Sequence, residues 1–310
     1  MLSTYAREAG MDTTVDVLDS RRLRVIAESV CKTDAIDASI LHELACSNLK
    51  LPICYMPDDE EFALREHLRA RCDMVHMRTM LKNRLHAVLH RRAILTPQGD
   101  LFTRNGRKFL EQIKLDQAGR EIVNRFLHAV DHLDQAVNDS TKDLRNLARS
   151  ARWAKPVALL TTTPGIGLIT SLTILAELGN IKRFSSRASV ANYAGLIPII
   201  RNSNEKHFAG GISRRGSRHL RAVLVEAAWM AVPRVPAYHD LFSRISLRKG
   251  KPTAIVAVAR RMLEDAYTRL KKDEAFRYQA VSFTEAKKND LLCAGMATQR
   301  SPEAASSVAG

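Results

Sequence analysis

Cysteine is scarce in this chain and follows no pattern that binds metal or forms disulfides. The 310 residues include five cysteines, without an even framework or a C-x-x-C pair: Cys31, Cys46, Cys54, Cys72 and Cys293. Disulfide scaffolds show paired cysteines, and zinc ribbons show C-x-x-C pairs. The sequence therefore excludes both classes and predicts five free thiols.

Clustered metal-binding histidines are also missing. His86 and His90 lie four residues apart in a predicted helix, but no glutamate or third ligand accompanies them. A protein zinc site takes three or four side-chain ligands. We therefore interpret the two histidines as residues of a helix surface.

Long apolar runs are absent as well. No run approaches the ~20 apolar residues that span a bilayer, and the chain does not open with a signal peptide. The sequence therefore predicts a cytoplasmic protein that does not partner with a membrane.

Acidic residues are few relative to basic ones. Lys and Arg number 48 against 33 Asp and Glu, which gives a formal net charge of +15 at pH 7. Such an excess indicates a polyanionic partner, and nucleic acid is favoured over a membrane surface. A chain of this length is long enough for two or three domains with hydrophobic cores.

The first part of the chain, residues 1–52, is predicted to be a partial α/β piece. Its pattern indicates a helix over 2–9, a β-prone stretch over 13–18 and a helix over 34–49. One strand and two helices are too few to close a sheet. The piece is therefore expected to belong to a larger domain.

Two long stretches with helical periodicity follow, over 58–92 and 117–148. Their apolar stripes include Phe62, Leu68, Val75, Leu81, Leu85 and Val88 or Leu89 in the first, and Ile122, Phe126, Ala129, Leu133, Ala136, Ser140, Leu144 and Leu147 in the second. Together they predict an antiparallel helical hairpin in a second domain, residues 58–152. The stripes are interpreted as core packing, and an exposed stripe could also be an oligomerisation surface.

A third domain is predicted over residues 153–280. Residues 157–180 indicate an apolar helix, a P-G-I-G turn and a second apolar helix that ends at Gly179. The turn is typical of a helix-hairpin-helix element, in which the amides from Gly165 to Gly167 can hold one DNA phosphate without reading sequence. A plain helical connection is the alternative. Residues 281–310 lack periodicity and are predicted to be a disordered tail.

The most informative segment runs from Tyr193 to Arg221. Ser203 follows an apolar run in what we predict to be a polar loop, and Gly210, Gly211 and Gly216 would permit tight backbone turns near a phosphate. Positive charge on the same segment comes from Arg214, Arg215, Arg218 and Arg221. The combination is typical of phosphodiester handling. A turn serine beside a solvated charged face is the plainer interpretation.

This segment resembles the C-terminal domain of the insertion sequence 110 family of transposases. Members carry G-L-x-P, then a serine, then G-G-I-[ST]-[KR]-[KR]-G-[NS]-x-x-L-R. The matching residues here are Gly195, Leu196, Pro198, Ser203, residues 210–217, Leu220 and Arg221, and the resemblance continues through 223–229 and 251–261. The family pattern usually has glycine after the serine, where this chain has Asn204 and Glu205.

A pair of carboxylates stands at the start of the helix predicted over 34–49. Asp34 and Asp37 are three residues apart, so both would leave the same helix face and could bind one Mg²⁺ with further oxygen ligands. From the residues alone, a helix cap and a first-turn charge are the simpler interpretation. The motif K-T-D-x-x-D-A, however, resembles the last two acidic residues of the family's RuvC-like D-E-D-D nuclease domain. The first Asp and the Glu of that set are not found, which we interpret as an N-terminally truncated nuclease domain.

The resemblance implies a mostly α fold: a truncated RNase H (RuvC)-like fragment, a helical hairpin and a mainly helical transposase domain. It implies a DNA transposase or recombinase in which Ser203 attacks a DNA phosphate while Asp34 and Asp37 hold Mg²⁺. Phosphates around the cut would be bound by Arg201, Lys206, Arg214, Arg215 and Arg218. The implied partners are DNA, in some members a guide RNA, and further copies of the chain in a dimer or tetramer at the bacterial nucleoid.

Two other function classes stay open. The chain could be a catalytically inactive nucleic-acid-binding remnant of such a transposase, which the missing Asp and Glu favour. It could also be a hydrolase that uses Ser203 on small esters. The sequence argues against the hydrolase, because it shows no G-x-S-x-G elbow and no evident His-Asp relay.

Overall fold

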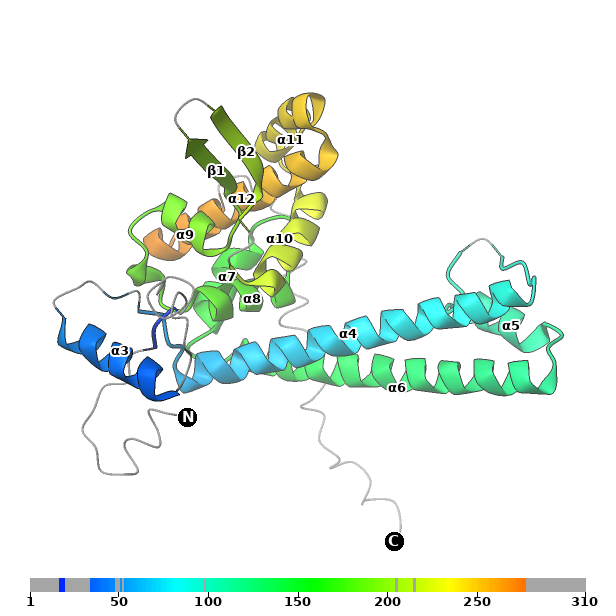
Figure 1. Ribbon diagram of the computed structural model, residues 1–310. Helices are drawn as coiled ribbons and strands as arrows, with labels where there is room; N and C mark the ends of the chain where they lie inside the picture. Colours follow the sequence, from blue (N-terminus) through cyan, green and yellow to red (C-terminus); the bar gives the residue numbers. More distant parts are fainter. Residues whose placement is uncertain are drawn as a thin grey trace, which may run out of the picture. The chain divides into compact units, whose positions relative to one another are not determined.

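The chain is mostly helical in its computed structural model (Figure 1). The structure describes residues 17–19, 34–47, 51, 53–97, 99–203, 206–213 and 216–276. The chain divides into two compact units, residues 1–60 and 61–310. The predicted mostly α class is confirmed, and the described residues contain a single two-stranded sheet.

In the first unit, the described residues form helix α3, the start of α4 and one isolated strand bridge. Helix α3 spans Asp34–Cys46, which confirms the helix predicted over 34–49 for most of its length. Leu18 pairs with Ile53 in the antiparallel bridge, and the Cys54 amide donates to the Val17 carbonyl at 2.7 Å. The helix predicted over 2–9 and most of the strand predicted over 13–18 lie outside the described residues.

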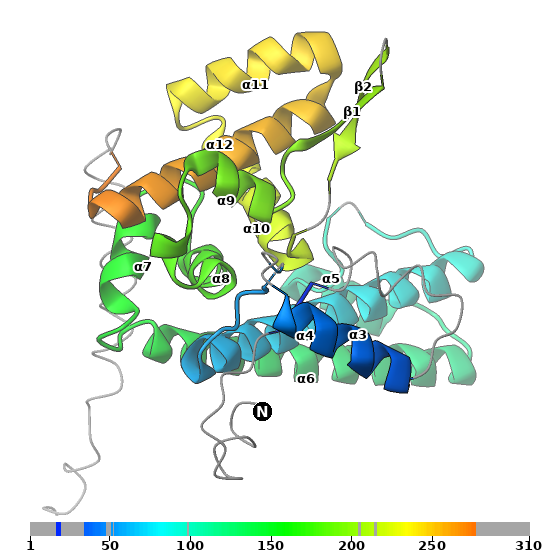
Figure 2. The same ribbon diagram turned by 60° about the vertical axis from the view of Figure 1, so that its left-hand side comes forward.

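The predicted helical hairpin is present. Helix α4 spans Asp59–Arg91 and helix α6 spans Gln117–Leu147, and the two lie side by side in both views (Figures 1 and 2). On α6 the fully buried apolar positions are Val123, Val130, Val137 and Leu144, one every seven residues, as in a coiled coil.

The predicted stripes are wrong at two positions. Phe62 is 52% exposed and Ile122 is 38% exposed, whereas Leu64 and Val123 are buried in their place. Periodicity gives the spacing of a stripe, but the facing helix decides which of two neighbouring apolar residues it covers.

The hairpin is closed by a folded element that the sequence analysis did not anticipate. Helix α5 spans Arg104–Gln112, and the Thr103 side chain caps it by accepting from the Gly106 amide. Its buried residue Leu110 packs in a small separate core with Leu101, Leu89 and Val123. A helix this short has little periodicity to detect, and contacts with α4 and α6 stabilise it.

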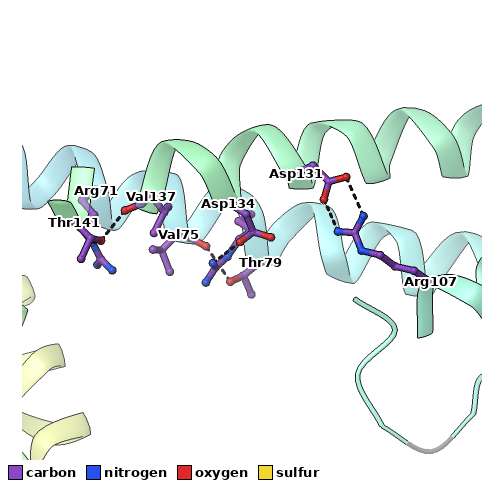
Figure 3. Close-up of polar contacts among 9 residues, drawn as sticks. Arg71, Val75, Thr79, Arg107, Asp131, Asp134, Val137 and Thr141 are labelled. Atoms are coloured by element: carbon purple, nitrogen blue, oxygen red, sulfur yellow. Dashed lines mark hydrogen bonds and ion pairs between the residues drawn. The ribbon is translucent and has the colours of Figure 1, made fainter. Parts of the chain in front are cut away.

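Polar contacts link α4, α5 and α6 along the hairpin (Figure 3). Arg71 Nε donates to Thr141 Oγ1 at 2.9 Å, and Arg78 pairs with Asp134 at 2.6 Å. Further along, Arg107 of α5 donates to Asp131 of α6 with both terminal nitrogens, one of them at 2.9 Å (Figure 3). These pairs set the register of the helices, because each joins residues 24 or more positions apart.

The remaining elements form a helical domain with one β-hairpin. They are α7 Ala154–Thr161, α8 Leu168–Leu178, the 3₁₀ helix η1 Ile181–Arg183, α9 Arg187–Tyr193, β1 Pro198–Ser203, β2 Lys206–Ile212, α10 Arg218–Ala231, α11 Pro236–Lys249 and α12 Lys251–Lys272. Helix α8 is buried at every residue from Ser171 to Leu178 and lies at the centre of the core. The helix, P-G-I-G turn and helix ended by Gly179 are therefore confirmed as secondary structure.

The base of the hairpin is joined to this domain by ion pairs with buried carboxylates. Arg65 Nε donates to the Ala176 carbonyl at 2.6 Å, and Arg69 pairs with the buried Glu177 at 3.2 Å. Arg152 pairs with the buried Glu61 at 3.1 Å. A buried carboxylate without its partner would be strongly destabilising, so these pairs hold α4 against α8 and against the segment that precedes α7.

Crossing a bilayer takes a long and strongly apolar helix, and the helices in the described ranges include none of that kind.

Candidate nucleic-acid interface

Ser203 is the last residue of a β-strand. Strands β1 and β2 pair antiparallel, with Ser203 opposite Lys206 and Arg201 opposite Phe208. The predicted polar loop at Ser203 is therefore wrong, because the strand begun by the β-branched residues Ile199 and Ile200 continues through the polar residues. The side chains of residues 199–210 lie outside the described part, so the backbone alone places Ser203, Arg201 and Lys206 together near the end of the hairpin.

The glycines of the motif differ in what they do. Gly210 and Gly211 lie within β2, so the prediction that they form tight turns is wrong. A Cβ on Gly211 would meet nothing within 4 Å. A Cβ on Gly216, by contrast, would lie 2.1 Å from the Tyr193 carbonyl oxygen. Gly216 is therefore the glycine whose missing side chain allows a close backbone approach, between the motif and the end of α9.

The Arg221 side chain stabilises the turn before α10. Its Nη1 donates to the Gly216 carbonyl at 2.7 Å and to the Ala194 carbonyl at 3.2 Å. The Ser217 side chain caps α10 by accepting from the Leu220 amide. Arg214 and Arg215 lie outside the described residues.

Arg218, the first residue of α10, has a different environment. It is exposed and makes no hydrogen bond or ion pair within the described part of the chain. Burial raises the pKa of the Cys72 thiol on α4, and the nearby Arg218 charge partly opposes that shift.

We expect Arg221→Ala to lower the free energy of unfolding by about 1–3 kcal/mol, because two partly buried carbonyls lose a charged donor. The matched control is Arg218→Ala, one turn earlier, which should change stability by less than about 0.5 kcal/mol. Urea unfolding followed by circular dichroism measures both. Equal stability losses would show that Arg221 is an ordinary surface cation.

The P-G-I-G turn is partly used for packing. Gly165 has φ +88°, and a Cβ there would lie 2.3 Å from the Ala227 carbonyl oxygen of α10. The Ile166 amide donates to the Thr163 carbonyl at 3.1 Å. Gly167 precedes α8 and no side chain caps that helix, so the first amides of α8 are the groups left for an anion. Phosphate binding by Gly165 and Gly167 in a helix-hairpin-helix element stays a prediction.

The acidic pair lies in the first unit. Asp34 opens α3 and Asp37 follows one turn later, so the backbone places both on one helix face. Their side chains are outside the described part. Among the side chains that the structure does describe, no three His, Cys, Asp or Glu residues come together as a metal site. The described cysteines, Cys46, Cys54 and Cys72, are free thiols as predicted, and His86 and His90 are exposed on α4.

Sequence reasoning missed a buried cation in α12. Arg269 donates to Thr163 Oγ1, and its guanidinium lies 3.9 Å from the centre of the Phe276 ring. Desolvation lowers the pKa of Arg269, and burial raises that of Tyr238, whose hydroxyl donates to Asp265 at 3.0 Å. Arg269 thus joins α12 to the segment between α7 and α8. An arginine in an amphipathic helix carries no sequence signal that distinguishes a buried role from an exposed one.

Two family models match this chain. The one described as "Transposase IS116/IS110/IS902 family" matches residues 157–243, which include the β-hairpin and α10. The other, described as "Transposase", matches residues 1–93.

Curated proteins with similar sequences carry related names. "Transposase for insertion sequence element IS1111A" from Coxiella burnetii is 24% identical over 286 residues, which cover 88% of this chain and 76% of that protein. "Putative transposase y4qE" from Sinorhizobium fredii is 25% identical over 269 residues, 86% of this chain and 62% of that protein. "Pilin gene-inverting protein" from Moraxella bovis is 31% identical over 122 residues, 38% of each chain. The chain thus spans about three fifths to three quarters of the first two relatives.

Proposed function

Since this chain belongs to the IS116/IS110/IS902 family of transposases, we propose that it breaks and rejoins DNA as the transposase of an insertion element, with Ser203 as the nucleophile. The observation that carries the proposal is the position of Ser203. It ends β1 opposite Lys206, and further along the same segment Gly216 and Arg221 lie against the end of α9.

The reaction we propose is a phosphoryl transfer through a covalent intermediate. Ser203 Oγ attacks a DNA phosphorus, the bond from phosphorus to the sugar oxygen breaks, and the sugar leaves as a free hydroxyl that takes the serine proton. A hydroxyl of the other DNA end then attacks the phosphoserine and regenerates the serine. Cations on the hairpin and the turn, Arg201, Lys206, Arg214, Arg215 and Arg218, would stabilise the charge on the phosphoryl oxygens.

The acidic pair fits a part of a magnesium site. Asp34 and Asp37 sit one turn apart on one face of α3, and carboxylate oxygens are the ligands that Mg²⁺ prefers. Two carboxylates do not complete an octahedral set, so further oxygen ligands must come from elsewhere. Bound Mg²⁺ would neutralise part of the negative charge on the phosphoryl oxygens.

Rejoining DNA needs two duplexes in one complex, so we propose that a dimer or tetramer is the active form. One relative is named a pilin gene-inverting protein. Inversion of a gene requires exchange of strands between two sites, which is the kind of reaction proposed here.

A covalent trapping assay tests the proposal. The full chain is incubated with Mg²⁺ and end-labelled duplexes that carry the two borders of its element, then denatured and digested for mass spectrometry. We expect a DNA adduct on the peptide that contains Ser203, and no adduct in EDTA. DNA binding with no adduct would instead support the inactive nucleic-acid-binding remnant. An adduct on another residue would remove Ser203 from the mechanism.

A further inference from the structure

The closed end of the helical hairpin is larger than a simple connection between two helices. We call residues 82–116 the hairpin knob: the end of α4, the connection and α5. Helix pairs are commonly joined by two to eight residues. Here the residues between α4 and α6 fold around their own core, in which Leu101 and Leu110 pack against Leu89 and Val123. A core of this kind is not needed to turn the chain around.

Positive charge is concentrated on the knob. Its 35 residues include eight Lys and Arg against three Asp and Glu. The stalk of the hairpin, residues 59–81 and 117–147, has eight Lys and Arg against ten Asp and Glu. A cationic end on a slightly acidic stalk cannot be explained by the general basicity of the chain. It indicates a polyanion that meets the knob and not the stalk.

Some cations of the hairpin knob make contacts that stabilise its fold, and the others face solvent. Arg92 pairs with Asp116 at 3.0 Å, and Lys82 lies 4.4 Å from the centre of the Phe102 ring. The exposed cations that make no hydrogen bond or ion pair within the described ranges are Arg84, Arg91, Arg104, Lys108 and Lys114. These five are available to a ligand.

One of the available cations is placed against the helix dipole. Arg104 is the first residue of α5, Lys108 follows one turn later, and the first turn contains no acidic residue. A cation at a helix N-terminus is destabilising, so helix stability does not account for Arg104. An anion bound there would be favoured both by the two side chains and by the dipole.

Helix α5 presents these cations from a rigid support. Arg107 binds Asp131 of α6 (Figure 3), and a Cβ on Gly106 would lie 2.4 Å from the Leu101 backbone. Arg120 of α6 donates to the Leu110 and Ile113 carbonyls at 2.6 Å each, which closes the end of α5. Arg104 and Lys108 lie on the face opposite Leu110, so both point away from the knob's core.

The length of α4 gives the distance between the knob and the helical domain that carries Ser203. Arg69 of α4 pairs with Glu177 of that domain at 3.2 Å, and α4 continues for 22 residues to Arg91. At about 1.5 Å per residue this is about 33 Å. One turn of duplex DNA is about 34 Å. A duplex held by the helical domain and lying along α4 would therefore reach the knob about one turn away.

We propose that the hairpin knob binds the sugar-phosphate backbone of duplex DNA about one helical turn from the DNA engaged by the helical domain that carries Ser203. This inference rests on the proposed function, because it takes the substrate to be DNA. The contact is to phosphates, so it adds affinity without sequence preference.

The test is a charge reversal on the knob with a matched reversal on the stalk. The knob variant is Arg104→Glu with Lys108→Glu, and the control is Lys142→Glu with Arg145→Glu on α6. Affinity is measured by fluorescence anisotropy against duplexes of about 10 and about 30 base pairs over a range of salt. Glutamate at position 104 suits the first turn of α5, and Lys108 is exposed with no ion pair in the described ranges, so the knob variant should keep its thermal midpoint.

On the duplex of about 30 base pairs, we expect the knob variant to bind roughly 30-fold more weakly near 0.15 M salt. Its salt slope should fall by about 2, since each phosphate contact contributes about 0.9. The stalk control should stay within about threefold of the unmodified chain. A duplex of about 10 base pairs is about 34 Å long, so one centred on the helical domain extends only about 17 Å to either side and ends before the knob. On that duplex the knob variant should also stay within about threefold.

Four results would overturn the inference. A knob variant with unchanged affinity and salt slope would show that the knob does not touch DNA, while the proposed function would stand. An equal loss of affinity on both duplexes would show that the knob does not form a second contact, away from the first, on the longer duplex. A loss confined to structured RNA would assign the knob to RNA. If the unmodified chain bound no duplex, the proposed function itself would fail, and the inference with it.

Discussion

Ser203→Ala is expected to reduce strand exchange by at least about 10⁴-fold, to no detectable product, in a chain or complex that is otherwise active. Removal of a nucleophile that forms a covalent intermediate leaves no alternative route of comparable rate. The methyl group of alanine fits where the hydroxymethyl group was, and Ser203 lies at the end of a strand, so folding should not change. Product formation on labelled DNA and duplex affinity are measured in parallel.

The matched control for this variant is Ser213→Ala, ten residues further along the same segment. The Ser213 hydroxyl is buried and has no hydrogen-bond partner within the described part of the chain. Its removal should therefore leave strand exchange unchanged, and both variants should bind duplex DNA within about twofold of the unmodified chain. Strand exchange by Ser203→Ala at a normal rate would exclude the serine mechanism.

Gly165→Ala is expected to lower the free energy of unfolding by about 2–5 kcal/mol. An alanine at φ +88° costs about 1–2 kcal/mol, and its Cβ would overlap the Ala227 carbonyl oxygen at 2.3 Å. Relief would require α8 and α10 to separate, although both belong to the main core. Such a loss is a large part of the roughly 5–15 kcal/mol that stabilises a domain. Denaturant unfolding of the purified variant measures it.

Gly167→Ala is the matched control for Gly165→Ala, because it adds a Cβ in the same turn. A Cβ on Gly167 would meet nothing within 4 Å, and its φ of −102° is open to any residue. Stability should therefore change by less than about 1 kcal/mol. Equal losses for the two alanine variants would mean that the turn does not pack against α10 as described.

Local patterns were sufficient for the long helices and for the motif around the serine. The apolar spacing in 58–92 and 117–148 predicted α4 and α6 to within a residue at each end. The G-G-I-S-R-R-G-S stretch pointed to a family before any contact was known, and two family models match the chain. These features depend on residues near one another in the sequence, where helical spacing and motif spelling are directly visible.

The arrangement of contacts was not predictable in the same way. Sequence reasoning put Ser203 in a loop, where the structure has the end of β1, and it counted Arg221 among the charges of the Ser203 segment, where the structure has it bound to two carbonyls. It chose Ile122 over the buried Val123, and it did not anticipate α5. In each case the deciding partner is a strand, helix or carbonyl that approaches only in the folded chain.

The sequence by itself determined the charge, the helical spacing and the family, because these are properties of residue types and of their order. Only the tertiary structure decided which glycine is sterically required, which arginine is used for packing, and where the unpaired cations gather. Gly165 and Gly167 have the same side chain, yet only Gly165 faces the α10 backbone. Burial and hydrogen bonding depend on groups far away in the sequence, and folding alone brings those groups together.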